Sequence, residues 1–180
     1  MSSLSSPASA IRPDMFRQVR AVAMDVDGVL TDGTFLWGAD GVELKRFCFA
    51  DVTGIALARE AGIVVALVSG ESSQSGMALV HRYAAKLKIG DVFAGCHDKA
   101  AALGDFARTH NIELAETCFI GDDVIDLAAM EIAGVACAPA DAHPAALARA
   151  AYVTQAAGGK GAVREVLDLV VAQHDVNRER

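Results

Sequence analysis

Residues 21–28 of this chain read AVAMDVDG. The first four residues are apolar, as in a buried strand, and they lead directly into Asp25, Asp27 and Gly28. Similar short apolar runs recur along the chain, and one of them, IVVALV at 63–68, shows no alternation with polar residues. Unbroken apolar strands are typical of a parallel sheet that is covered on both faces. We predict strands near residues 20–26, 63–68, 91–94, 116–120, 134–137 and 151–153.

Segments with helical periodicity fill the intervals between these strands. In the clearest one, Val163, Val166, Leu167 and Val170 form the apolar stripe of an amphipathic helix. The alternation of strands and helices is the pattern of βαβ units, so we predict an α/β fold with a parallel sheet. Residues 33–48 break the alternation, because two short runs flank an Ala-Asp-Gly turn signal, and we predict a β-hairpin there.

The length of 180 residues suits one domain, since a typical domain has about 150 residues. Hydrophobic residues make up 53% of the chain, and the larger ones suffice for a core although 35 residues are alanines. We expect a disordered tail at residues 1–13, a single domain at 14–173 and a short tail at 174–180.

Composition and local patterns argue against several classes of function. No apolar run approaches the roughly 18 residues of a membrane-spanning helix, and residues 1–13 lack the apolar stretch of a secretory signal. The formal charge of −7, without a cluster of Lys or Arg, argues against a surface for nucleic acid or anionic lipid. The cysteines at positions 48, 96, 118 and 137 form no C-x-x-C pair, so reduced thiols in the cytoplasm fit them best. We therefore expect a small-molecule partner.

Polar residues follow the predicted strands at the ends where open parallel sheets bind their ligands. Asp25 and Asp27 follow the first strand, and Ser69-Gly70 ends the second. Lys99 follows the third strand, and Gly121-Asp122-Asp123 the fourth. Taken alone, each has an ordinary explanation as a cap, a turn or a surface lysine, and D-x-D-G arises by chance about 0.1 times in such a chain. The joint pattern predicts one site.

These side chains suit phosphoryl transfer through an aspartyl phosphate. Asp25 would attack phosphorus as the nucleophile, while Asp27 would donate a proton to the leaving oxygen and later take one from water. Because carboxylate and phosphate repel each other, the site needs cations. Lys99 supplies one, and Mg²⁺ would be held by Asp25, Asp122 and the carbonyl of Asp27. The Ser69 hydroxyl would hold the phosphate oxygens.

Other candidate groups receive no catalytic role. The histidines, at positions 81, 97, 110, 143 and 174, lack metal-ligand spacing. GGKG at residues 158–161 lacks the Ser or Thr and the upstream glycine of a P-loop, and we interpret it as a flexible loop.

The motifs around Asp25, Ser69, Lys99 and Asp122 resemble the four motifs of the haloacid dehalogenase superfamily of phosphatases. This resemblance implies a Rossmann-like fold of three layers without a cap domain, and dependence on Mg²⁺. It further implies a homotetramer in which the projecting hairpins pack together and a neighbouring subunit covers each site.

The ending of the chain narrows the resemblance. ADAHP at 140–144 and the segment 152–165 are similar to the 3-deoxy-D-manno-octulosonate 8-phosphate phosphatase branch, and the similarity spans residues 20–171. The Gly-rich segment would then close over a neighbouring site, and the product would feed the synthesis of cell-surface polysaccharide such as lipopolysaccharide.

The residues beside the site depart from that branch. It usually has Arg-Asp-Gly-x-Gly where this chain has ADVTG at 50–54, and Gly-Arg where this chain has Gly70-Glu71, and residues 72–77 form a longer stretch here. The sister branch that acts on nonulosonate 9-phosphates has Glu at position 71 and Lys at the position aligned with Lys86. Glu71 would accept hydrogen bonds from sugar hydroxyls, and Arg82 or Lys86 would bind the substrate carboxylate. We assign substrate contacts to Gly28, Gly70, Glu71, Arg82, Lys86 and Asp123.

Three readings of the function stay open at this point. The first is a Mg²⁺-dependent phosphomonoesterase for octulosonate 8-phosphate, with 2-keto-3-deoxynononate or sialic acid 9-phosphate as the alternative substrate. The second is a phosphorelay receiver, although a receiver resembling that family would carry its acidic pair on strand one and its phospho-acceptor on strand three. The third is a non-catalytic oligomerisation domain, against which the intact Asp25 and Asp27 weigh.

Overall fold

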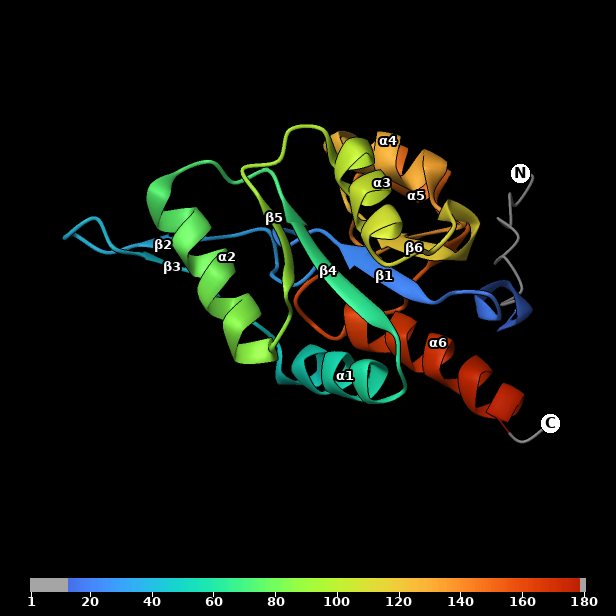
Figure 1. Cartoon of the computed structure of the whole chain (residues 1–180). Helices are drawn as coiled ribbons and strands as arrows, with labels where there is room; N and C mark the ends of the chain where they lie inside the picture. Colours follow the sequence, from blue (N-terminus) through green and yellow to red (C-terminus); the bar gives the residue numbers. More distant parts are fainter. Residues whose placement is uncertain (1–12, 179–180) are drawn as a thin grey trace, which may run out of the picture.

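The computed structural model describes residues 13–178, which form a six-stranded parallel sheet between helices (Figure 1). The strands of this sheet are β1 (Ala21–Met24), β4 (Val64–Ser69), β5 (Asp91–Ala94), β6 (Thr117–Ile120), β7 (Val135–Ala138) and β8 (Tyr152–Val153). Their order is β5-β4-β1-β6-β7-β8, and every neighbouring pair is parallel. This is the doubly wound, Rossmann-like order, whose direction reverses between β1 and β6. A receiver has its first strand in a different place, between the second and third, so the topology excludes the receiver hypothesis.

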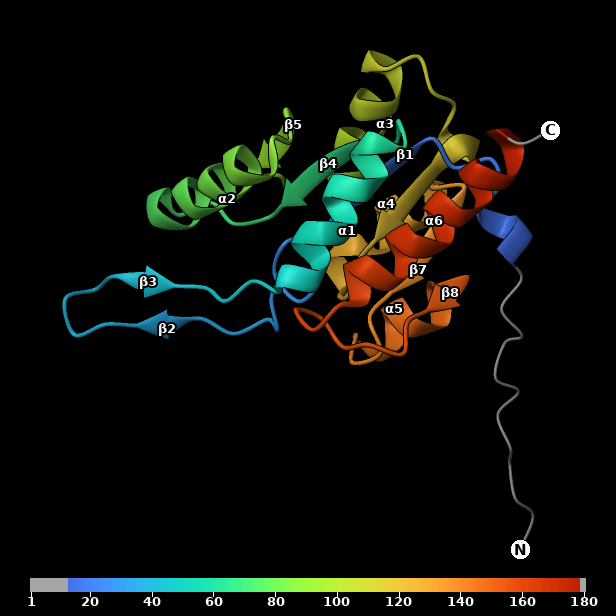
Figure 2. The ribbon, with the colours of Figure 1, turned by 90° about the horizontal axis from the view of Figure 1, so that it is seen from below.

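Two layers of helices cover the sheet (Figures 1 and 2). One face carries α1 (Phe49–Glu60), α2 (Gln74–Leu87) and α6 (Ala162–Arg178), and the other carries α3 (Lys99–Thr109), α4 (Leu127–Ile132) and α5 (Pro144–Arg149). Short 3₁₀ helices lie at η1 (Pro13–Phe16), η2 (Leu114–Glu116) and η3 (Val124–Asp126). Because side chains alternate along a strand, Val22 and Met24 enter one core while Ala21 and Ala23 enter the other. Both faces of β1 are therefore buried, as the unbroken apolar run predicts.

Two boundaries differ from the sequence prediction. β1 ends at Met24, before the predicted end at residue 26, because the backbone turns after Asp25 even though Val26 is buried. α6 continues to Arg178, so the expected tail at 174–180 begins as helix, and His174 Nε2 forms a 2.5 Å hydrogen bond with the carbonyl oxygen of Val19. The expected tail at 1–13 lies outside the described residues except for Pro13, which begins η1.

The predicted hairpin is present as β2 (Leu36–Trp37) and β3 (Glu43–Leu44), and Figure 2 shows it projecting away from the sheet. Gly41 adopts a φ of +79° in its turn, a conformation that favours glycine. The hairpin leaves large apolar side chains in solvent, namely Phe35, Leu36, Trp37, Val42 and Leu44. Within residues 13–178 this hairpin is the insertion after β1, and no separate cap domain is present.

The helices α1 and α6 meet at a buried carboxyl group. Asp51 of α1 accepts a 2.8 Å hydrogen bond through Oδ1 from the backbone N–H of Arg164, in the first turn of α6. Gly54 allows this close approach, because a Cβ there would lie 2.8 Å from the Arg164 side chain. Burial raises the pKa of Asp51, although backbone hydrogen bonds oppose the shift. Its Oδ2 is buried without a hydrogen-bond partner in the described chain.

All four cysteines are free, in agreement with the sequence prediction. In the part of the chain that the structure describes, no helix combines the length and the apolar character needed to cross a membrane.

Candidate active site

A cavity of about 540 Å³ opens at the carboxyl ends of β1, β4 and β6, where the strand order reverses. This volume suits a small-molecule ligand. The residues that line the cavity are Asp25, Asp27, Gly33, Phe35, Lys45, Gly70, Glu71, Ser72, Cys96, His97, Lys99, Asp122, Asp123 and Ile125. The cavity brings together residues that follow all four of the predicted strand ends, namely Asp25, Asp27, Gly70, Lys99 and Asp122.

Asp25 is the buried carboxylate at the end of β1. Its Oδ1 accepts a 2.7 Å hydrogen bond from the backbone N–H of Val26, and its Oδ2 lies 2.8 Å from Lys99 Nζ. Lys99 Nζ also lies 2.6 Å from Oδ1 of Asp126. Burial raises the pKa of Asp25 to about 8, repulsion from Asp126 adds to the shift, and Lys99 opposes it. Burial would lower the pKa of Lys99, but the two carboxylates outweigh it, so this pKa is raised and Lys99 stays charged.

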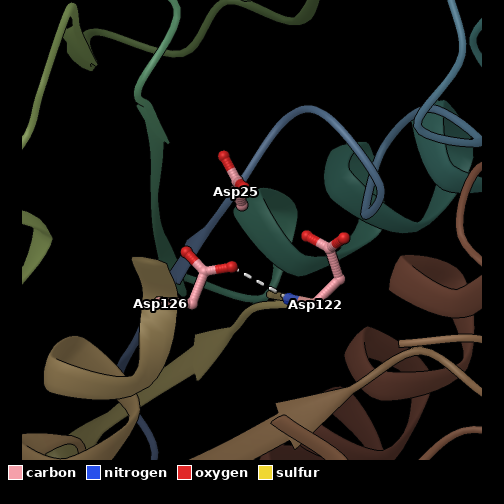
Figure 3. A group of neighbouring side chains, drawn as sticks. All are labelled: Asp25, Asp122 and Asp126. Carbon is pink, nitrogen blue, oxygen red and sulfur yellow. Dashed lines mark hydrogen bonds between the residues drawn. The ribbon is translucent and has the colours of Figure 1, made fainter. Parts of the chain in front are cut away.

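Asp25, Asp122 and Asp126 form the acidic cluster shown in Figure 3, with one carboxylate oxygen from each within 4.8 Å of the others. Burial raises the pKa of Asp122 to about 7, with a further rise from Asp126. Asp122 Oδ1 is buried and has no hydrogen-bond partner among the described residues. Clustered carboxylate oxygens, one of them unpaired, are ligands that a hard divalent cation such as Mg²⁺ prefers. The residues therefore fit a Mg²⁺ site.

The close approach of Asp122 to the end of β1 depends on Gly28. This glycine has a φ of +89°, and a Cβ on it would lie 2.0 Å from Asp122 Oδ2. Gly28 lies beside the acidic cluster and is not among the residues that line the cavity, so its predicted substrate contact stays a prediction.

Asp126 organises the cluster from η3. Its Oδ2 accepts hydrogen bonds from the backbone N–H groups of Asp122 (2.9 Å) and Asp123 (3.1 Å), while its Oδ1 accepts one from Nζ of Lys99. Because both oxygens already have partners, Asp126 orients the other residues of the cluster. The sequence prediction missed it, although the D-x-x-D spacing from Asp123 to Asp126 is a capping-box signal that η3 uses.

Asp27 lines the cavity, and its carboxylate pairs with Lys45. Its two carboxylate oxygens lie 2.8 and 2.9 Å from Nζ of Lys45, which directly follows β3 of the hairpin. A predicted metal contact from Asp27 would thus use its backbone carbonyl, because its carboxylate is occupied by Lys45. Lys45 was also missed in the sequence, where a lysine in a short hairpin carries no site signal of its own.

The connection after β4 contributes Gly70 and Glu71 to the cavity wall. The Glu71 carboxylate accepts a 2.8 Å hydrogen bond from the backbone N–H of Ser73, which lowers the pKa of Glu71. Ser69 is buried behind them, and its hydroxyl accepts a 3.2 Å hydrogen bond from the N–H of Glu71. Asp123, from the connection after β6, also lines the cavity and caps η3 through its side chain.

The structure keeps Arg82 and Lys86 outside this cavity. Both are exposed on α2, and Lys86 Nζ lies 5.3 Å from the centre of the Phe49 ring. Residues four apart share one face of a helix, and the buried face of α2 is taken by residues such as Tyr83 and Leu87. Arg82 and Lys86 therefore occupy the solvent face, and within this chain they do not meet the predicted carboxylate site.

The Gly-rich segment at 158–161 packs on the chain's own D-x-D-G turn. Gly158 donates a 2.9 Å hydrogen bond to Asp141, and Gly159 donates one of 2.9 Å to the carbonyl of Val29. A Cβ at Gly158 would lie 1.9 Å from the carbonyl oxygen of Gly28. Within this chain the segment therefore packs on its own site, and its closure over a neighbouring site stays a prediction.

Comparison with known proteins places this geometry among phosphatases. Residues 72–167 match the model of the haloacid dehalogenase-like hydrolase family. The chain is 40% identical over 165 residues, 92% of its length and 86% of the relative's, to the 3-deoxy-D-manno-octulosonate 8-phosphate phosphatase of Escherichia coli K12. The crystal structure of that phosphatase from Yersinia pestis has a TM-score of 0.85 at 37% identity, covering 91% of this chain and 86% of the other. The enzyme from Moraxella catarrhalis was solved with a magnesium ion, a phosphate ion and KDO, which is 3-deoxy-D-manno-octulosonate. Its structure has a TM-score of 0.84 at 34% identity, covering 93% of this chain and 95% of the other.

Proposed function

We infer, from the premise that the chain belongs to the haloacid dehalogenase-like hydrolases, that it hydrolyses the phosphate ester of 3-deoxy-D-manno-octulosonate 8-phosphate. One observation carries this inference. A buried Asp25, paired with Lys99, faces the same cavity as Asp27 and lies beside Asp122, whose Oδ1 has no partner. Relatives that are 40% identical to this chain over 92% of its length are 3-deoxy-D-manno-octulosonate 8-phosphate phosphatases.

The cofactor of this reaction is Mg²⁺. Asp25 and Asp122 would hold it with their carboxylates and Asp27 with its backbone carbonyl, and Asp126 keeps Asp122 in place through the backbone. When bound, Mg²⁺ neutralises charge on the phosphate and on the carboxylates around it.

In the proposed reaction, an oxygen of Asp25 forms a bond to phosphorus while the bond from phosphorus to the sugar oxygen breaks. Asp27 gives its proton to that leaving oxygen. A water molecule then attacks phosphorus of the aspartyl phosphate and loses its proton to Asp27, which restores the Asp25 carboxylate and releases phosphate. Lys99, which lines the cavity, and the buried Ser69 hydroxyl would stabilise charge on the phosphate oxygens. Gly70, Glu71 and Asp123, which also line the cavity, would contact the substrate.

Phosphate release tests this function. The experiment compares octulosonate 8-phosphate, 2-keto-3-deoxynononate 9-phosphate and an aryl phosphate, each with and without Mg²⁺. We expect kcat/KM to be at least about tenfold higher for the octulosonate ester than for the other two. A higher kcat/KM for 2-keto-3-deoxynononate 9-phosphate would instead assign the enzyme to the sister branch that acts on nonulosonate 9-phosphates. This chain shares the Glu at position 71 with that branch.

Two variants control that assay. Asp25→Asn keeps the shape of the side chain and removes the nucleophile, so it should abolish phosphate release. Asp105→Asn, in an exposed ion pair with Arg108, should leave the rate unchanged. Phosphate release by Asp25→Asn at the wild-type rate would refute the aspartyl-phosphate mechanism.

We further propose that four copies assemble through the hairpins and that the enzyme works in the cytoplasm. The exposed apolar side chains of β2 and β3 support the assembly, because a monomer rarely leaves so many large apolar groups in solvent on one projecting element. The four free cysteines support a reducing compartment.

A further inference from the structure

Lys45 reaches the cavity because of its place in the hairpin. It follows β3 directly, and since side chains alternate along an extended chain, Glu43 and Lys45 lie on one face and Leu44 on the other. Leu44 is 56% exposed, whereas the Lys45 side chain is only 3% exposed. The hairpin thus turns its apolar face to solvent and its charged face to the active site.

The Lys45 ammonium is surrounded by three carboxylates. It lies 2.8 and 2.9 Å from the two oxygens of Asp27, and 3.7 Å from oxygens of both Glu43 and Glu71. Burial would lower the pKa of Lys45, but the ion pairs, led by the one with Asp27, outweigh it and raise this pKa. The three carboxylates thus hold the Lys45 ammonium beside Asp27.

Asp27 has little else to hold its carboxyl group. Its side chain is 37% exposed, and apart from Lys45 its hydrogen bond among residues 13–178 is a long one, 3.5 Å, from the Thr31 hydroxyl. The contrast with Asp25 is clear, because Asp25 is buried between a backbone N–H and Lys99. Without Lys45, the Asp27 carboxyl group would keep only this long hydrogen bond from Thr31.

We propose that Lys45 is a positioning residue for Asp27, and that by binding the Asp27 carboxyl group from the hairpin it aims this group at the leaving oxygen of the substrate. This inference rests on the proposed function, from which the acid role of Asp27 comes. Lys45 can keep one carboxyl oxygen while the other carries the proton to be donated. The hairpin is then part of the active site of its own chain.

The test uses the dependence on the leaving group. An alkyl sugar phosphate needs a proton at the leaving oxygen, whereas nitrophenyl phosphate expels a stable phenolate without one. We expect Lys45→Met to lower kcat/KM for the sugar phosphate by at least about 100-fold, the contribution typical of general acid catalysis, and for nitrophenyl phosphate by less than about tenfold. Lys45→Arg, which can bind a carboxylate with two hydrogen bonds, should recover the sugar phosphate activity to within about tenfold of wild type.

Arg46→Met is the matched control. It removes the same charge from the next residue of the hairpin, where Arg46 is exposed and pairs with Asp32 at 2.6 Å. We expect it to change kcat/KM by less than about twofold for either substrate, as an exposed ion pair contributes little.

Three results would overturn the proposal. An equal loss of activity of Lys45→Met on both substrates would make Lys45 a general structural or binding residue, and unchanged activity would give it no role. A crystal structure of Lys45→Met with the Asp27 side chain in its original conformation would also refute the positioning role, whatever the substrate. The proposed function fails separately, if the wild-type enzyme with Mg²⁺ releases no phosphate from the sugar ester.

Discussion

At the scale of single residues, Asp51 shows two opposing electrostatic effects. Its position at the N-terminus of α6 favours the charged form, because the helix dipole and the N–H of Arg164 are oriented toward it. Its complete burial favours the neutral form, and burial is the larger effect, since the pKa of Asp51 is raised. The unpaired Oδ2 is consistent with this balance.

This balance predicts how the stability of Asp51→Asn depends on pH. A carboxyl whose pKa is raised in the folded state stabilises the fold fully below its unfolded pKa of 3.8, and this contribution is lost as pH rises through the folded value. Asparagine keeps the oxygen that accepts from Arg164 and has no such titration. The free energy of unfolding of wild type, relative to Asp51→Asn, should therefore fall between pH 4 and neutral pH.

Urea denaturation of both proteins at several pH values measures that difference. Asp168→Asn, which removes an exposed carboxylate from the same helix, serves as the control and should show no such trend. A wild-type advantage that grows with pH would mean that the helix dipole outweighs burial at Asp51.

Residue types alone predicted the chemical core of the site but not its supports. Asp25, Lys99 and Asp122 follow apolar runs, so their position could be inferred from the strand pattern. Lys45 and Asp126 could not be assigned in this way, because their roles depend on contacts across 18 and 27 positions of sequence. Long-range partners of this kind become visible only when the chain is folded.

At the scale of elements, the turn after β1 is clamped from two sides by glycines. Gly28 leaves room for Asp122, and Gly158 brings the 158–161 segment within contact of the Gly28 carbonyl. The turn that carries Asp27 is thus held between the acidic cluster and the segment that precedes α6.

A pair of glycine variants tests this clamp. In Gly158→Ala the new Cβ would lie 1.9 Å from the Gly28 oxygen, so the turn must shift, and we expect a loss of about 1–3 kcal/mol of stability together with a fall in kcat/KM. Gly104→Ala is the control, because a Cβ at this position in α3 meets no atom within 4 Å and should add about 0.5–1 kcal/mol.

Urea denaturation and phosphate release are measured for both proteins. Equal behaviour of the two variants would show that the 158–161 segment can move without disturbing the turn, and that the clamp does not exist.

The elements themselves followed closely from the sequence. Five of the six sheet strands lie within one residue of the predicted ranges at each end, because buried parallel strands need unbroken apolar runs. The main discrepancy is β1, where the buried Val26 extends the apolar pattern into a turn. Arg82 and Lys86 lie outside the cavity of their own chain for another reason, because they occupy the exposed face of α2.

At the scale of the whole molecule, the hairpin is the part whose surface is unlike that of the rest. Leu36 and Leu44 are paired across the two strands and are 69% and 56% exposed. If the hairpins join four copies, charges placed on this pair should separate them, because burying an unpaired carboxylate is costly.

We therefore expect the double variant Leu36→Asp, Leu44→Asp to dissociate. Sedimentation velocity should give wild type a mass near four times 18.7 kDa and give the variant a smaller mass. Val153→Asp, an exposed apolar residue of β8, is the control and should keep the wild-type mass. A wild-type monomer, or a double variant of unchanged mass, would contradict assembly through the hairpin.

Some residues of the candidate site lie at strand ends and others on the connections between elements, and this arrangement has an evolutionary consequence. The groups that we propose to bind phosphate follow the ends of the sheet strands and contact one another, whereas Glu71 and Lys45 lie on a connecting segment and on the hairpin. Connections tolerate insertions and exchange of residues far better than buried strands do. Related enzymes can therefore come to accept different sugar phosphates through substitutions in residues 71–77 while the residues at the strand ends stay the same. The same segment is the place to change in order to design a different substrate specificity.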